Sequence, residues 1–204
     1  MMSTTIVIAS YRYGHLAGHA IESVLSQTVA PSTIVFVDDG AFDCAHLPSI
    51  YPQIEYVFRD KNMGIVSNFN DMLHRVTTDR VMFLGADNWL RDDTLQKVLS
   101  VDRDIVTYDI IVTGARRDEI LERHPDQVTM CEGSYYWDRS SGHHGSMLYN
   151  VSMAKDVGGY DSPSGRTVED QVLYNRLLSA GATREHIPAG LLFYRRHKEN
   201  FNHC

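Results

Sequence analysis

The chain has 204 residues, 43% hydrophobic and 22% charged, a composition typical of a folded globular domain and not of a disordered chain. The formal net charge of −7 disfavours proteins that bind by neutralising nucleic-acid phosphates, because such binding needs clustered lysine and arginine. The densest basic tract, residues 194–198, is short. We therefore expect no nucleic-acid partner.

Cysteine usage and the N-terminal sequence suggest a cellular location. The three cysteines, Cys44, Cys131 and Cys204, form no C-x-x-C pair, which favours a reducing compartment over a disulfide framework. Residues 1–10 lack the basic start of a signal peptide, and no apolar run approaches the roughly 20 residues that a membrane helix needs. We expect a cytoplasmic protein without a membrane span.

Strands and helices alternate through the first hundred residues. Short β-branched runs predict strands, and apolar residues at helical spacing predict the helices between them. The expected strands are 5–9, 34–37, 54–58 and 81–84, and the expected helices are 15–28 and 65–76. This alternation predicts an α/β fold with a mostly parallel central sheet and helices on both faces.

The second half of the chain is less regular. Its expected strands are 105–113, 145–149 and 191–194, and its expected helix is 168–180, followed by Gly181. The segment that continues to about Tyr136 mixes charged residues with short β-like stretches. No linker divides the chain, so we expect a single domain over residues 1–204 whose two halves share one sheet.

Polar residues directly follow three of the early strands. These are Ser10-Tyr11, Asp38-Asp39 and Asp87-Asn88. The carboxyl ends of parallel strands lie along one edge of a sheet, where ligands bind. Carboxylates there would repel a bare diphosphate, whereas a divalent cation between them bridges the charges and stabilises a departing diphosphate. Each pair taken alone is also a common turn former, but the repeated pattern favours a ligand site.

Eight segments, in order, resemble the family 2 glycosyltransferases of the GT-A fold. Residues 6–11 and 20–28 are similar to that family's first strand and helix, and Val37-Asp38-Asp39-Gly40 is similar to its second-strand signature. The remaining segments are 62–70 with Asn62-Met63-Gly64, 83–88 at the place of the metal motif, Gly158-Gly159-Tyr160-Asp161, Glu169-Asp170 and Arg195-Arg196-His197. The resemblance covers nearly the whole chain.

The resemblance implies a single GT-A-type domain and an inverting hexosyltransferase. Such an enzyme moves a sugar from a nucleotide-sugar donor, with UDP the usual nucleotide, to an acceptor hydroxyl by metal-assisted single displacement. Residues 1–100 would bind the donor and residues 101–204 the acceptor, a glycan or another hydroxyl compound. The implied cofactor is Mn²⁺ or Mg²⁺, and the implied process is glycan or polysaccharide synthesis.

The resemblance also assigns roles to individual residues. Asp170 would be the general base. The metal would be held by Asp87, Asn88 and His197. The nucleotide sugar would contact Ala9, Ser10, Tyr11, Asp38, Asp39, Asn62, Gly64, Ala86 and Asp87. The acceptor would contact Trp137, His143, His144 and Glu169.

The sequence departs from the family pattern at the metal motif. The family usually has Asp-x-Asp or Asp-Asp, whereas Gly85-Ala86-Asp87-Asn88 has one carboxylate and an adjacent amide. Ala9-Ser10 also stands where Pro-Thr is frequent. An amide oxygen can complete the shell of a hard cation, so we expect a metal site that is weak without the nucleotide. An alternative is a non-catalytic nucleotide-sugar-binding module descended from such an enzyme.

Two other enzyme classes, and purely structural roles for single residues, are alternatives to this interpretation. A nucleotidyltransferase or a dehydrogenase would need a glycine-rich loop after the first strand, which is absent. Glu169 and Asp170 begin an expected helix, where acidic residues are favoured by the helix dipole. His143 and His144 are neighbours in an expected extended segment, so their side chains should point in opposite directions and share no metal. For His197, a surface position in the basic tract is the alternative.

Overall fold

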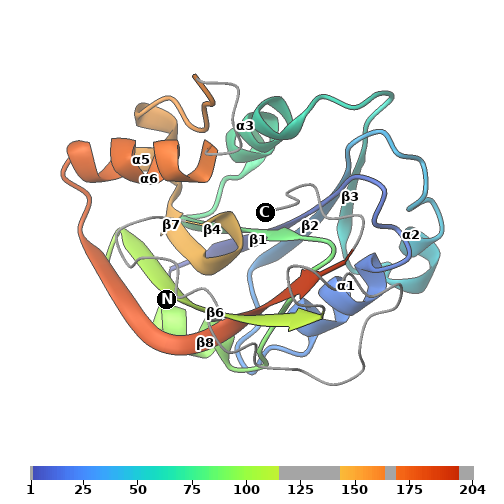
Figure 1. The fold of residues 1–204 in the computed structure, drawn as a ribbon, viewed down its shortest axis with the longest axis horizontal. Helices are drawn as coiled ribbons and strands as arrows, with labels where there is room; N and C mark the ends of the chain where they lie inside the picture. The colour runs from blue at the N-terminus through green and yellow to red at the C-terminus, as the bar shows by residue number, and fades with distance from the viewer. Residues whose placement is uncertain (1, 115–142, 164–168, 198–204) are drawn as a thin grey trace.

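The computed structural model describes residues 2–114, 143–163 and 169–197. Within these residues a single eight-stranded sheet has the order β3-β2-β1-β4-β7-β6-β8-β5 (Figure 1). The strands are β1 Thr4–Ser10, β2 Thr33–Asp38, β3 Glu55–Phe58, β4 Arg80–Gly85, β5 Trp89–Leu90, β6 Ile105–Gly114, β7 Met147–Asn150 and β8 Arg184–Arg196. The helices are α1 Ala17–Leu25, α2 Leu47–Ile50, α3 Ile65–Arg75, α4 Thr94–Leu99, α5 Val151–Asp156 and α6 Glu169–Ser179.

The sheet is mixed but mostly parallel. Strands β3, β2, β1 and β4 pair in parallel, and so do β6 and β8. Strand β7 is antiparallel to both of its neighbours, and the short β5 is antiparallel to β8. Because β1 lies between β2 and β4, the ends of these three strands meet at one edge, as the sequence predicted.

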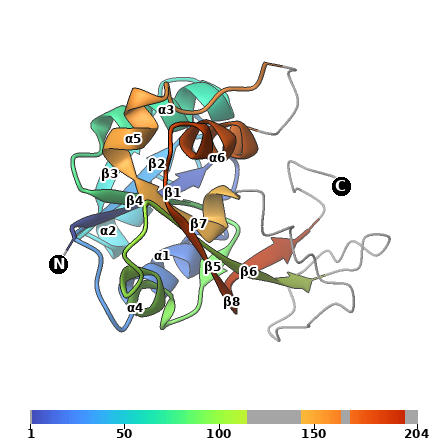
Figure 2. The same cartoon turned by 90° about the vertical axis from the view of Figure 1, so that its left-hand side faces the viewer.

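Helices cover both faces of the sheet (Figure 2). The core on one face includes buried residues of α1, α2 and α4, and the core on the other includes buried residues of α3, α5 and α6. In α1 the buried apolar residues are Ala17, Ala20, Ile21 and Val24, the i, i+3, i+4, i+7 spacing of a one-sided helix. A fully buried Ile or Val side chain contributes roughly 1.5–3 kcal/mol, so this stripe is sufficient to hold α1 on the sheet.

Several elements differ from the sequence-based expectations. The strand expected at 145–149 begins only at Met147, because His144–Ser146 form the short 3₁₀ turn η1, in which the Ser146 N–H donates to the His143 carbonyl at 2.9 Å. Strand β8 is longer than the expected 191–194, since it pairs with β6 over its whole length, with irregularities around Asp109. The short elements α2, β5, α4 and α5 were not predicted, and the segment before Tyr136 lies outside the described residues.

The long β8 brings the C-terminal part of the described chain to the ends of β1 and β4. Strand β5, which directly follows the β4 end, pairs with β8 so that Trp89 lies opposite Phe193. Residues just beyond Phe193 are thereby placed beside Asp87. Among the described helices, none has the length and hydrophobicity to cross a bilayer.

Candidate active site

The ends of β1, β2 and β4 are joined by backbone hydrogen bonds into one edge. Ser10 lies opposite Asp38 in the sheet register, and the Asp39 N–H donates to the Ser10 carbonyl at 2.8 Å. The Ala86 N–H donates to the Ala9 carbonyl at 2.9 Å. The structure therefore brings together the predicted donor-binding residues of all three strands.

Asp39 connects this edge to the loop before α3. Its carboxylate accepts hydrogen bonds from Asn62 Nδ2 at 3.1 Å and from the Met63 N–H at 2.9 Å. Burial raises the pKa of Asp39, while the backbone donors of Met63 and Gly64 act in the opposite direction. Gly64 has a φ of 77°, a conformation that suits glycine, at the start of α3. Asp39, Asn62 and Gly64 thus form one connected wall of the edge.

Asp38 and Tyr11 have different surroundings. Asp38 Oδ1 accepts the Ala41 N–H at 2.9 Å, so this carboxylate has a turn-forming contact as well as a place at the edge. Tyr11 is half-buried, and the Arg12 guanidinium lies 5.0 Å from its ring centroid. The Tyr11 ring therefore remains partly accessible beside the ends of the strands.

Asp87, Asn88 and His197 form a buried cluster at the end of β4. His197 Nε2 lies 3.2 Å from Asp87 Oδ2, and Asn88 Nδ2 donates to Asp87 Oδ1 at 2.9 Å. The Asn88 side-chain oxygen accepts the Arg195 N–H at 2.9 Å. A carboxylate and an imidazole that point at one spot fit a divalent cation such as Mn²⁺. The Asn88 oxygen is instead directed at β8, so Asn88 orients Asp87 and joins it to the last strand.

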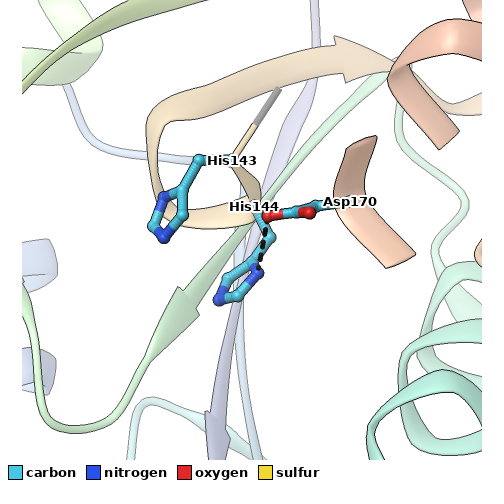
Figure 3. A group of neighbouring side chains, drawn as sticks. All are labelled: His143, His144 and Asp170. Carbon is cyan, nitrogen blue, oxygen red and sulfur yellow. Dashed lines mark ion pairs between the residues drawn. The ribbon is translucent and has the colours of Figure 1, made fainter. Parts of the chain in front are cut away.

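His143, His144 and Asp170 form a second group, between η1 and the start of α6 (Figure 3). His144 Nδ1 lies 3.7 Å from Asp170 Oδ2, and Asp170 Oδ1 accepts the Gln171 N–H at 2.7 Å. The two imidazole rings are stacked, with centroids 4.7 Å apart. The expectation that the histidines point in opposite directions is wrong, because η1 turns the backbone where an extended chain was assumed.

The electrostatics of this group favour a proton-handling role over metal binding. Burial opposes charge on His144, but the Asp170 carboxylate outweighs it and raises the pKa of His144. Burial likewise acts to raise the pKa of Asp170, and the contact with His144 outweighs it, so the Asp170 pKa is lowered. Burial and the neighbouring His144 lower the pKa of His143 to about 3. Side-chain atoms of all three residues lie within 4.8 Å of one another, but the His144–Asp170 contact is already an ion pair.

Glu169 is the remaining described residue that was expected to contact the acceptor. Its side chain is buried beside Asp170, and burial raises the pKa of its carboxyl group. Within the described residues, its Oε2 has no hydrogen-bond partner. A buried carboxyl oxygen without a partner would gain from the hydroxyl of a ligand. The other expected acceptor residue, Trp137, lies outside the described residues.

A known protein family matches most of the chain. The family model for glycosyl transferase family 2 matches residues 5–158. The chain belongs to glycosyl transferase family 2. The prediction of a glycosyltransferase-type enzyme is therefore confirmed at the level of the family.

Two curated glycosyltransferases match about half of the chain. An uncharacterised glycosyltransferase of Nostoc sp. is 32% identical over 107 residues, which are 49% of this chain and 33% of that protein. Glycosyltransferase GlyA of Streptococcus pneumoniae is 24% identical over 110 residues, which are 50% of this chain and 16% of that protein. The match thus spans a third or less of the length of these curated relatives.

Solved structures with the same fold include those of S. aureus TarS. The structure of its residues 1–349 with UDP-GlcNAc has a TM-score of 0.74 and 14% identity, covering 98% of this chain and 60% of that one. The complex with UDP has a TM-score of 0.72 and 16% identity, covering 95% and 60%. These matches confirm the predicted single α/β domain of GT-A type.

In this family 2 glycosyltransferase, sequence reasoning assigned no role to Arg195. The Arg195 guanidinium lies 4.6 Å from the Trp89 ring centroid, and one of its nitrogens lies 2.6 Å from His19 Nδ1. Burial lowers the pKa of Arg195, and the charge of Asp87 acts in the opposite direction. Its place in the Arg195-Arg196-His197 segment was the only signal in the sequence, because its partners lie more than a hundred residues away along the chain.

Proposed function

We propose that this protein transfers a sugar from a nucleotide-sugar donor, with UDP as the nucleotide, to an acceptor hydroxyl with inversion at the anomeric carbon. The observation that carries the proposal is the convergence of two groups of side chains on neighbouring elements. One is the Asp87–His197 pair at the end of β4, and the other is Asp170 with His144. The structures of S. aureus TarS with UDP and UDP-GlcNAc, which share this fold, support the choice of donor.

The donor half of the proposal uses residues 1–100. The nucleotide would be surrounded by residues at the strand ends and in the loops beside them: Ala9, Ser10, Tyr11, Asp38, Asp39, Asn62, Gly64, Ala86 and Asp87. The partly exposed Tyr11 ring offers a stacking face for the base. Asp87 and His197 would hold Mn²⁺ or Mg²⁺, whose charge stabilises the diphosphate as it departs. Asn88 would contribute indirectly, by holding Asp87 through its amide nitrogen.

The transfer half uses residues 101–204, with Asp170 as the carboxylate of the general base. The acceptor oxygen attacks the anomeric carbon from the side opposite the diphosphate, which inverts the centre in one displacement. The base removes the proton from that oxygen as the new bond forms. The acceptor would contact His143, His144, Glu169 and Trp137. We place this reaction in cytoplasmic glycan or polysaccharide synthesis.

A thermal-shift panel tests the donor site. UDP-, GDP-, dTDP- and CMP-sugars are each added with and without Mn²⁺, since a ligand that binds only the native state raises the melting temperature. We expect a Mn²⁺-dependent shift with UDP-sugars that Asp87→Ala abolishes. Asp156→Ala, an exposed substitution at the end of α5, is the matched control and should retain the shift. If none of the donors shifted the melting temperature in the presence of Mn²⁺, the result would contradict the proposed site.

A non-catalytic nucleotide-sugar-binding module is the second candidate. It is favoured by the single carboxylate of the metal motif, since Asn88 replaces the usual second acid and its oxygen is directed at Arg195. Such a module would bind the donor without consuming it. Release of UDP from UDP-sugars, with water or added acceptors, distinguishes the two: turnover above the Asp87→Ala background supports the enzyme, and binding without turnover supports the module.

A further inference from the structure

The carboxylate assigned to the general base has both of its oxygens engaged. Asp170 Oδ1 accepts the Gln171 N–H at 2.7 Å, and Oδ2 faces His144 Nδ1 at 3.7 Å. The Asp170 side chain is 11% exposed, whereas that of His144 is 19% exposed. An acceptor that approaches this pair would therefore meet the imidazole more readily than the carboxylate.

The His144 ring is held so that its two nitrogens have different surroundings. Nδ1 faces Asp170, and Nε2, on the opposite side of the ring, points away from the carboxylate (Figure 3). The edge-to-face contact with Phe69, at 5.3 Å between centroids, and the stacked His143 ring fix this orientation. In the described part of the chain, Nε2 makes no hydrogen bond, so it is the nitrogen left for a substrate.

We propose that His144 and Asp170 act as a single base unit, in which His144 Nε2 takes the proton of the acceptor hydroxyl and Asp170 holds the opposite nitrogen. This inference rests on the proposed transferase function and specifies the atom that receives the proton. Asp170 then acts as a positioning residue. A carboxylate that orients an imidazole and stabilises its protonated form is an established arrangement in other enzymes.

The step balances with the groups already named. The acceptor oxygen forms a bond to the anomeric carbon, the bond from that carbon to the diphosphate oxygen breaks, and its electron pair leaves with the nucleotide. The hydroxyl proton moves to Nε2, and the imidazolium that forms pairs with the Asp170 carboxylate. The 3.7 Å contact is looser than a hydrogen bond, as is common for catalytic contacts before substrate binds.

The charges around His144 favour its protonated form. Asp170 and Glu169 on α6 and Asp87 after β4 act to raise its pKa, against the effect of burial. From η1 the neighbouring group is His143, whose lowered pKa keeps it uncharged near neutral pH. The contact between the two side chains thus makes His144 the stronger proton acceptor, whereas the same contact lowers the pKa of Asp170 and weakens its carboxylate as a base.

The pH dependence of kcat/KM distinguishes His144 from Asp170 as the proton acceptor. Release of UDP from a UDP-sugar is measured from pH 5.5 to 8.5 with saturating Mn²⁺. If His144 must be uncharged, kcat/KM falls as pH drops through the His144 pKa. If Asp170 alone accepts the proton, kcat/KM stays flat over this range, a result that would overturn the proposal.

His144→Asn separates proton transfer from simple positioning, because the asparagine amide can still donate to Asp170 but cannot accept a proton. We expect kcat to fall by roughly 10²–10⁴, and the remaining rate to lose the acidic limb of its pH profile. His186→Gln is the matched control, since His186 forms another His–Asp pair, 3.0 Å from Asp109 on β6, and should leave the rate unchanged.

Near-wild-type turnover by His144→Asn would also overturn the proposal. Failure of the proposed function looks different, because the wild-type protein would then show no Mn²⁺-dependent donor shift or no turnover at any pH. A donor shift retained in His144→Asn shows that the protein is folded and that the loss lies in the chemical step.

Discussion

The two halves of the site are held in different ways. At the donor edge, residues 9–64, the polar side chains follow directly after strands and are fixed by contacts within this part of the chain, as Asp38 is by the Ala41 N–H and Asp39 by the Met63 N–H. In the transfer region, residues 143–197, the contacts join distant parts of the chain, as His197 with Asp87 and Arg195 with Asn88. The parallel sheet aligns the strand ends of the first half, whereas the second half depends on how η1, α6 and β8 pack beside those ends.

The largest expected effect is in the transfer region. Asp170→Asn keeps the shape of the side chain but removes its charge, so kcat should fall by roughly 10²–10⁴. Because the contacts of Asp170 are with His144 and Gln171 and not with the proposed metal ligands Asp87 and His197, the Mn²⁺-dependent thermal shift with UDP-sugar should be unchanged. Steady-state UDP release and the thermal shift, measured on the same preparation, check both parts. Loss of the donor-induced thermal shift in Asp170→Asn would mean that donor binding also depends on the charge of Asp170.

The next effect tests a contact between α3, which follows the donor edge, and the segment of the transfer region before α6. Asn70 of α3 donates from Nδ2 to the Tyr160 carbonyl at 2.8 Å and accepts the Tyr160 N–H at 2.8 Å, shortly before α6. Gly159 has a φ of 66°, and a Cβ there would collide with the Asn70 side-chain oxygen. We expect Gly159→Ala to lower the free energy of unfolding by about 2–4 kcal/mol, measured by urea denaturation.

Gly181→Ala is the matched control for this substitution. Gly181 also has a positive φ, 88°, but no atom lies within 4 Å of an added Cβ. Gly181→Ala should therefore lower the free energy of unfolding by the backbone strain alone, roughly 1 kcal/mol. Equal losses in the two variants would mean that the Asn70 contact does not connect the regions.

This contrast also explains what the sequence could predict. Strand ends such as Asp38-Asp39 and Asp87-Asn88 could be located because the alternation of apolar runs is local, and a parallel sheet aligns the ends. The His143–His144 stack could not be predicted, since it depends on the η1 turn, for which the apolar pattern carries no signal. The Asn88–Arg195 contact was missed because a spacing of 107 residues leaves no periodicity to read.

The smallest expected effect lies within the donor half alone. Asp71 of α3 forms ion pairs with Arg59 at 2.5 Å and with Arg75 at 2.7 Å, and its side chain is 34% exposed. Burial would raise the pKa of Asp71, but the two arginines outweigh it, so the folded-state pKa is lowered. The contribution to stability is thus fully present above the unfolded-state pKa of about 3.9 and is lost as pH falls through the folded-state value.

Because solvent screens a group exposed to this extent, Asp71→Asn should cost no more than about 1 kcal/mol at pH 7. Urea denaturation of wild type and variant at pH 7 and pH 3 measures the difference, which should shrink at the lower pH because pH 3 lies below the unfolded-state pKa. Arg75→Gln, which removes only the more exposed partner, is the control and should cost about half a kcal/mol or less. A difference that grew on acidification would mean that Asp71 is not ion-paired in the folded state. Since Asp71 and Arg75 lie on α3 and make none of the hydrogen bonds that join Asp39 to Asn62 and Met63, the donor shift should persist in both variants.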